Sequence, residues 1–192
     1  MPQTVDQLRH LIAETPALAE PLAALRTLDL ADAWIGAGLL RNAVWDVAHG
    51  RPIAPPNDVD VAHFDPTDPR PERDAELEAA LARQAQGVPW EGRNQARMHL
   101  RHGDPPYADS LDAIGHWVET ATAVAARLTP DGRIELAAPH GFDDLFDLIV
   151  RPVPAHAPDL TAFRERAARK RWTARWPRLQ VVETAAPPTE SG

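Results

Sequence analysis

Two carboxylates lie one residue apart in an apolar, β-branched stretch, residues 57–64, and this pattern constrains the fold more than any other. Val59 separates the two acids, and Val61, Ala62 and Phe64 continue the apolar stretch after them. Because side chains alternate along a strand, both carboxylates are predicted on one face. Like charges held side by side repel, and burying them is costly without a partner. A divalent cation such as Mg²⁺ is the simplest partner; two solvated acids at a strand edge are the alternative.

A glycine-containing turn precedes this segment. Residues 33–42 read as a short apolar strand followed by the turn at Gly36, Ala37 and Gly38, which leads into a helix that is expected to reach about His49. Glycine permits close approach of the backbone to a ligand, and the N–H groups at a helix start favour phosphate. The turn is therefore predicted to bind phosphate.

The order strand, glycine turn, helix, Asp-x-Asp strand resembles nucleotidyltransferases of the DNA polymerase β superfamily. The turn resembles the Gly-Gly-x-Val-Arg-Asp signature of CCA-adding enzymes and poly(A) polymerases, with Ala37 in place of the first glycine and Asn42 in place of the acid. The stretches 41–46, 94–99 and 119–124 also resemble a small bacterial nucleotidyltransferase-like family. That resemblance extends from Leu22 to Leu179.

The resemblance implies a polymerase β-like fold of the α+β class (or α/β), a small mixed sheet with packed helices and the active site at one sheet edge. It implies transfer of a nucleoside monophosphate from an NTP, with Mg²⁺ or Mn²⁺ held by Asp58 and Asp60. Such sites carry a third carboxylate on a neighbouring strand. Glu91 is the expected third acid, and Asp65, which otherwise caps a loop, is the second choice. The acceptor hydroxyl or amine, on a small molecule or on RNA, stays open.

Further polar residues have a functional and a structural reading. Arg41 and Asn42, which fall on the signature, are expected to bind substrate or phosphate, and the guanidinium of Arg41 matches phosphate geometry. The alternative for Arg41 is a surface pair with Asp46 or Asp32. Asn94 and Arg97 are candidates for reading substrate, or for a buried network that only rigidifies the fold.

A long helix is expected from Asp109 or Ser110 to about Leu128. Within it, Thr120 is expected to bond the carbonyl of His116, and Glu119 to pair with Arg97 or Arg41.

Composition limits the possible partners. The net charge of −8 argues against non-specific nucleic-acid binding by the whole surface. Residues 164–178 are nevertheless strongly basic and either hold RNA or pair with acids of this chain; Trp172 and Trp176 among them either stack on a base or pack as a helix face. The chain has no cysteine, no apolar run of membrane-spanning length and no signal-peptide pattern, so a cytoplasmic protein is expected.

One nucleotidyltransferase-like domain is expected over 1–182, followed by a disordered tail over 183–192. Other expected helices cover 4–13, 16–28, 71–84, 143–148 and 159–172, with strands at 88–95 and 133–137. Two rival functions remain at this point. One is a nucleotide-binding or interaction protein that has lost turnover, and the other is an RNA-modifying nucleotidyltransferase.

Overall fold

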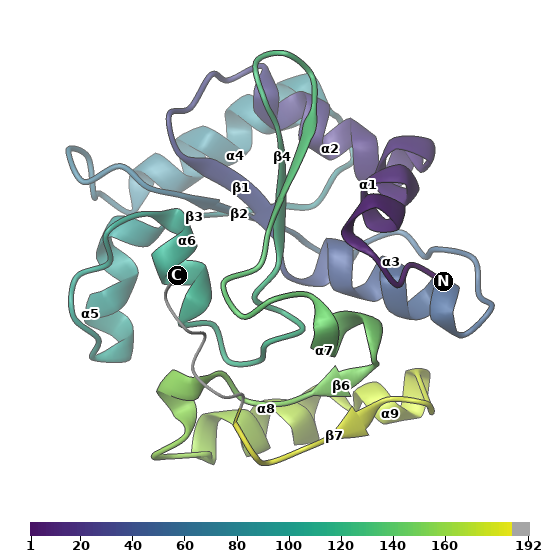
Figure 1. Cartoon of the computed structure of the whole chain (residues 1–192). Helices are drawn as coiled ribbons and strands as arrows, with labels where there is room; N and C mark the ends of the chain where they lie inside the picture. The colour runs from purple at the N-terminus through teal and green to yellow at the C-terminus, as the bar shows by residue number, and fades with distance from the viewer. Residues whose placement is uncertain (186–192) are drawn as a thin grey trace.

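A mixed five-stranded sheet organises the molecule (Figure 1). The computed structural model describes residues 1–185. The sheet has the order β3-β2-β1-β4-β5, in which β2 and β3 are parallel and the other neighbours antiparallel. The strands are β1 (Ala33–Gly36), β2 (Val59–His63), β3 (Trp90–Asn94), β4 (Ala125–Leu128) and β5 (Ile134–Ala137). The α+β expectation is confirmed.

Helices surround the sheet, and most begin within a few residues of where the sequence predicts. Thr4 caps the first helix by accepting a hydrogen bond from the backbone N–H of Gln7. The helices are α1 (Val5–Glu14), α2 (Pro16–Arg26), α3 (Gly38–Ala48), α4 (Glu72–Gln84), α5 (Met98–His102), α6 (Ser110–Gly115), α7 (Asp143–Phe146), α8 (Thr161–Lys170) and α9 (Trp172–Arg175), with 3₁₀ turns η1 (Gln95–Arg97) and η2 (Pro154–His156).

The two faces of the sheet are covered unequally. On one face Ile35, Val59 and Val61 join the large core with α1, α2 and α4. On the other face only a small cluster, which includes Trp34 and Ala62, packs under α6 and the loops. Because side chains alternate along β2, Asp60 shares this second, incompletely covered face with Ala62.

A second layer lies beside the sheet. It contains α7, α8, α9 and the two-stranded parallel sheet of β6 (Ile149–Val150) and β7 (Gln180–Val181) (Figure 1). Trp172 and Trp176 pack edge-on against Trp45 of α3, with ring centroids 6.0 and 5.2 Å apart. All three indoles are buried. These aromatic contacts join the C-terminal helices to the core, so packing explains Trp172 and Trp176, and base stacking does not.

The predicted long helix over 109–128 is wrong. Helix α6 ends at Gly115, the chain then turns, and residues Ala125–Leu128 form β4 between β1 and β5. Thr120 donates to a carboxylate oxygen of Asp144 at 2.6 Å and not to His116. The apolar run that suggested one helix face is divided between α6, the turns after it and the start of β4, where buried apolar residues follow one another and periodicity cannot tell helix from strand.

The expected tail over 183–192 lies largely outside the described residues. Its first residue, Glu183, accepts two hydrogen bonds from Arg164 of α8, the shorter at 2.6 Å. Within residues 1–185, none of the helices has the length and hydrophobicity needed to cross a membrane.

Candidate active site

Three carboxylates lie together on the less covered face of the sheet. Asp60 is in β2, Asp58 directly precedes that strand, and Glu91 of β3 is the parallel register partner of Asp60. Register partners on adjacent strands point to the same face. Glu91, the expected third acid, therefore lies on the same face as Asp60, and its role in the site stays a prediction.

The electrostatics of these acids are unfavourable in the protein alone. Burial, followed by repulsion from Asp58 and Glu91, raises the pKa of Asp60 from 3.8 to about 6, and Arg41 and Arg166 only partly oppose this. Within residues 1–185, neither Asp58 nor Asp60 has a hydrogen-bond or ion-pair partner. Glu91 differs, because it accepts a hydrogen bond from Arg93 at 2.7 Å.

These contacts determine how well the acids fit a metal ion. In the described part of the chain, no three His, Asp or Glu side chains lie close enough together to hold a metal ion. Arg93 holds Glu91 through the ion pair. Asp58 and Asp60 remain partly buried, mutually repelling and unpartnered, which is the donor set that suits a hard divalent cation.

The glycine turn lies against this acidic pair. A Cβ atom on Gly38 would be 3.4 Å from an Asp58 carboxylate oxygen, so the first turn of α3 directly adjoins the carboxylate. At Gly36 a Cβ atom would lie only 2.9 Å from both Trp117 and the Val124 carbonyl, so only glycine fits there. Ala37, between them, has φ of 52° and ψ of −123°, a region that favours glycine.

Arg41 is close to the acids but is engaged elsewhere. It is 4 % exposed, donates to the Thr122 hydroxyl at 2.7 Å and to the Asn42 amide oxygen, and lies 5.1 Å from the Trp45 and Trp172 rings. The alternative pairing with Asp46 or Asp32 is wrong.

Those two acids have other partners. Asp46 accepts hydrogen bonds from Arg175 and from the Trp176 indole, and Asp32 accepts from the Trp34 indole and the Ser110 backbone N–H.

Asn94 and Arg97 belong to a structural network at the end of β3. Asn94 is fully buried and donates to the backbone carbonyls of Asp65 and Asp68, while Arg97 pairs with Asp74. Neither side chain lines the cleft described below. Asp65 accepts from Thr67 and from the backbone N–H of Asp68, so it caps its loop as its structural reading predicted.

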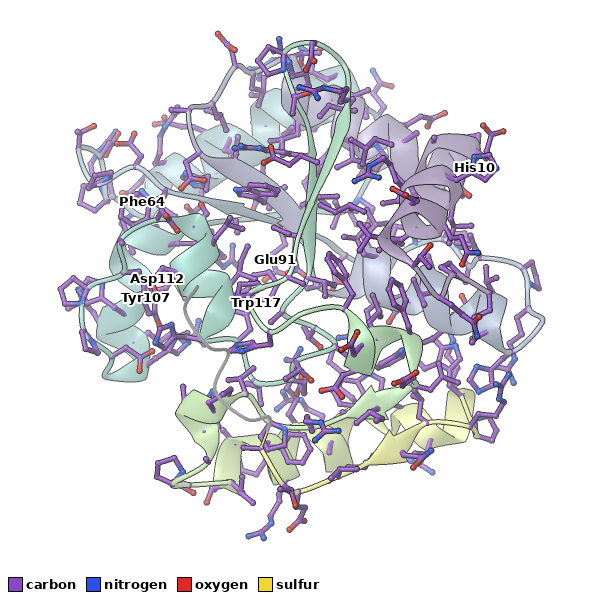
Figure 2. The ribbon with its side chains drawn as sticks, viewed as in Figure 1. His10, Phe64, Glu91, Tyr107, Asp112 and Trp117 are labelled. Atoms are coloured by element: carbon purple, nitrogen blue, oxygen red, sulfur yellow. The ribbon has the colours of Figure 1, made fainter. Side chains whose placement is uncertain are left out.

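A cleft of about 700 Å³ opens over the acids, between the sheet and α8. Figure 2 shows Glu91 and Trp117 in the middle of the molecule, and both line this cleft. Several residues of its walls could not be predicted from the sequence, because they come from distant segments without a shared motif. These residues are Arg93, Arg101, His102, His116, His156 and Thr122.

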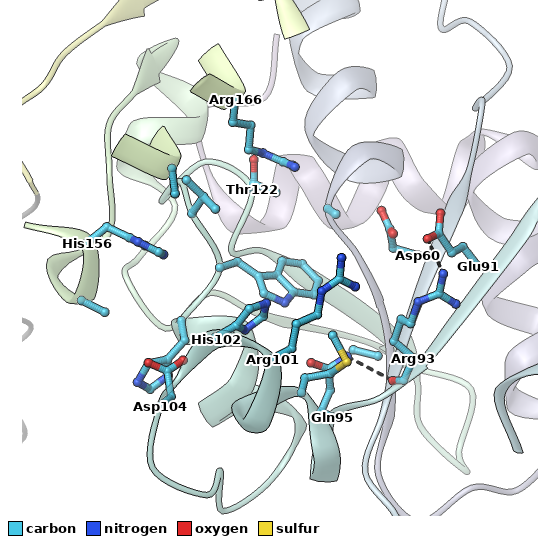
Figure 3. Close-up of a pocket in the computed structure, with 18 of the residues that line it drawn as sticks. Asp60, Glu91, Arg93, Gln95, Arg101, His102, Asp104, Thr122, His156 and Arg166 are labelled. Atoms are coloured by element: carbon cyan, nitrogen blue, oxygen red, sulfur yellow. Dashed lines mark hydrogen bonds and ion pairs between the residues drawn. The ribbon is translucent and has the colours of Figure 1, made fainter. Parts of the chain in front are cut away.

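Part of the basic C-terminal segment pairs with acids of this chain. Arg166 pairs with the fully buried Glu119 at 2.8 Å, and Arg175 pairs with Asp46 at 3.1 Å. The expected pairing of Glu119 with Arg97 or Arg41 is therefore wrong. Arg166 and Arg169 also line the cleft, across from Asp60. Figure 3 shows Arg166 facing the cleft beside Thr122.

Comparison with known proteins agrees with this geometry. An NMR structure described as revealing a CCA-adding enzyme head domain is 29% identical to this chain and has a TM-score of 0.85. The match covers 96% of this chain and 98% of the chain in the NMR structure. The fold is thus that of a polymerase β-type nucleotidyltransferase head domain, as the resemblance implied. Residues 23–181 match the family described as Nucleotidyltransferase. The chain belongs to this nucleotidyltransferase family.

Larger enzymes share the fold at lower identity. A CCA-adding enzyme in complex with CTP is 13% identical with a TM-score of 0.59, and covers 94% of this chain and 44% of its own. The Thermotoga maritima CCA-adding enzyme complexed with tRNA is 15% identical with a TM-score of 0.59. That match covers 95% of this chain and 43% of the enzyme. The chain therefore spans less than half the length of these enzymes. No curated protein shows significant sequence similarity to it.

Proposed function

We propose that the chain transfers a nucleoside monophosphate from an NTP to a hydroxyl or amine of an acceptor, with Mg²⁺ or Mn²⁺ held by Asp58 and Asp60. The observation that carries this proposal is the unpartnered carboxylate pair against Gly38. The bound cation supplies positive charge beside the triphosphate and the reacting oxygens. It also removes the repulsion that raises the pKa of Asp60.

The residues around this pair have separate tasks in the proposal. The backbone N–H groups at the start of α3, next to Gly36, Ala37 and Gly38, bind the triphosphate, helped by the positive end of the helix dipole. Asn42, which accepts from Arg41, keeps that guanidinium within the first turn of α3. Arg41 acts by positioning Thr122 in the cleft wall.

The transfer itself is a substitution at the α-phosphorus. The acceptor oxygen or nitrogen forms a bond to this phosphorus while its bond to the oxygen that bridges to the β-phosphate breaks, and pyrophosphate leaves. Glu91 is the remaining carboxylate at this face and accepts the proton that the acceptor loses. For this task it must leave Arg93, to which it is paired at 2.7 Å.

One rival has an observation in its favour. Ala37 stands in place of a glycine, and Glu91 is paired with Arg93. A protein that binds nucleotide without turnover would tolerate both features. The RNA-modifying rival would have to rely on Arg169, Lys170 and Arg171, since Arg164, Arg166 and Arg175 pair with acids of this chain.

Product analysis tests the proposal against the rival. The protein is incubated with an NTP mixture, Mg²⁺ and cell extract, and products are sought by mass spectrometry. We expect a product heavier by one nucleotidyl group, that is a nucleoside monophosphate less one water, with wild type and none with Asp58→Asn/Asp60→Asn. If wild type binds nucleotide but no such product forms, the rival without turnover is correct.

A further inference from the structure

The cleft has a second group of charges, distinct from the acidic pair. Arg101, His102, His116 and His156 line the same cleft as Asp60, and we call this group the histidine end. Figure 3 shows His102 and His156 on one side of the close-up and Asp60 on the other.

The charges around each group are different. The charges that act most strongly on the pKa of Asp60 are Asp58, Glu91, Arg41 and Arg166. Those that act most strongly on the pKa of His102 are Asp104, Arg101, His156 and His116. The charges that act most strongly on Asp60 are thus different from those that act most strongly on His102.

The histidine end has an arginine and an imidazole without partners. Within residues 1–185, Arg101 and His156 make no side-chain hydrogen bond or ion pair, although both line the cleft. The acid in the group, Asp104, accepts a hydrogen bond from the Tyr107 hydroxyl. Burial, and then repulsion from Arg101, His156 and His116, lowers the pKa of His102 even though Asp104 opposes it. An anion at this position would relieve the repulsion.

We propose that the histidine end binds a phosphate group carried by a small-molecule acceptor. This inference rests on the proposed function, because it assigns one end of the cleft to each substrate. Arg101 supplies a guanidinium that matches phosphate geometry, and the imidazoles of His102 and His156 supply further N–H donors. A cleft of about 700 Å³ has the size of a small-molecule site.

Trp117 connects the two ends. Its ring packs against Gly36 of the phosphate-binding turn, and its neighbour in sequence, His116, belongs to the histidine end. An acceptor anchored through its phosphate would thus extend along Trp117 toward the α-phosphorus. Anchoring of this kind raises the effective concentration of the acceptor group beside the nucleotide.

Inorganic phosphate tests the inference without nucleotide or metal. Histidine side-chain NMR signals are followed during a phosphate titration of wild type, of Arg101→Gln and of Arg83→Gln, a matched change at an exposed position on α4. We expect saturable shifts of His102 and His156, an affinity about tenfold lower in Arg101→Gln, and no change in Arg83→Gln. Circular dichroism confirms folding of each variant. The absence of saturable shifts, or an equal loss in both variants, would overturn the inference.

Two further arms identify the source of the phosphate. The phosphate titration is repeated with a saturating non-hydrolysable ATP analogue and Mg²⁺. Retained phosphate binding supports an acceptor site. Displacement of phosphate by the analogue would assign the histidine end to the triphosphate and overturn the inference. Labelled tRNA is titrated at low and moderate salt; tight, salt-sensitive binding lost in Arg101→Gln would overturn the small-molecule acceptor. If the chain binds no nucleotide, the proposed function fails, but the phosphate titration still decides this inference.

Discussion

At the scale of single residues, Ala37 carries backbone strain at the centre of the site. Its φ of 52° and ψ of −123° lie where an L side chain is disfavoured. The sequence comparison places Ala37 at the first glycine of the signature, and the structure supplies the reason that glycine suits the position. The strained backbone is fixed between Gly36, packed under Trp117, and Gly38, packed against Asp58.

Ala37→Gly is expected to stabilise the protein by about 1 kcal/mol, because relief of the strain exceeds the loss of a methyl group and the added freedom of the unfolded chain. Urea unfolding measures the change. Ala79→Gly, at an exposed position inside α4, is the control and should destabilise by about 1 kcal/mol. Destabilisation of the same size in both variants would contradict strain at Ala37.

Asp60 predicts a pH dependence. Burial and repulsion from Asp58 and Glu91 raise its native pKa from 3.8 to about 6. The folded state therefore holds the proton more tightly than the unfolded chain, and the free energy of unfolding falls as the pH rises between these two values. Without metal, Asp60→Asn should be more stable than wild type by on the order of 1 kcal/mol at about pH 8.

The difference between wild type and Asp60→Asn should disappear toward about pH 4, where the native carboxyl is protonated. Denaturant unfolding in the presence of a chelator, at the two pH values, checks the expectation. Asp29→Asn, at a highly exposed acid, should show no comparable gain. A less stable Asp60→Asn protein at the higher pH would show that Asp60 stabilises the fold through a partner.

At the scale of secondary structure, the sequence predicts elements with a clear period and fails where burial hides it. Helix α1, with its Thr4 cap, and the amphipathic α4 are where the pattern put them. Strand β4 was mistaken for part of a helix because Ala123, Val124 and Ala125 are all completely buried and show no alternation. Gly115, where α6 ends, was the available signal for a helix terminus.

Helix α8 is held to the core by a buried acid. Glu119 is fully buried and pairs with Arg166 at 2.8 Å, whereas the Arg164–Glu183 pair on the same helix is largely exposed. Arg166→Ala would leave the Glu119 charge buried and uncompensated, so we expect a loss of about 3 kcal/mol. Arg164→Ala should cost less than about 1 kcal/mol.

Urea unfolding of both arginine variants gives these free energies. Adding Glu119→Gln to Arg166→Ala should recover part of the loss, since the orphaned charge is then removed. Equal effects of Arg164→Ala and Arg166→Ala would mean that the buried pair does not hold α8.

At the scale of the whole molecule, some residues of the site can be predicted from local sequence pattern, and others are brought together only by the fold. Asp58, Asp60 and Glu91 were predicted from strand periodicity and resemblance, and the sheet brings them to one face. The opposite wall, from Arg101 through His156 to Arg169, comes from segments that share no motif. Asn94 and Arg97 follow a strand as site residues often do, but tertiary contacts draw them into the network around Asp65 and Asp74.

The central claim is that Asp58 and Asp60 hold a divalent cation which in turn holds the nucleotide. Thermal and chemical unfolding with Mg²⁺ and each NTP tests it in wild type, in Asp58→Asn/Asp60→Asn, and in Asp6→Asn/Asp29→Asn, a matched charge change at two exposed acids. At a nucleotide concentration about a hundred times the dissociation constant, wild type and the matched control should gain about 2.7 kcal/mol, and the Asp58→Asn/Asp60→Asn protein should gain nothing. An equal gain in all three proteins would contradict the metal-binding role of Asp58 and Asp60.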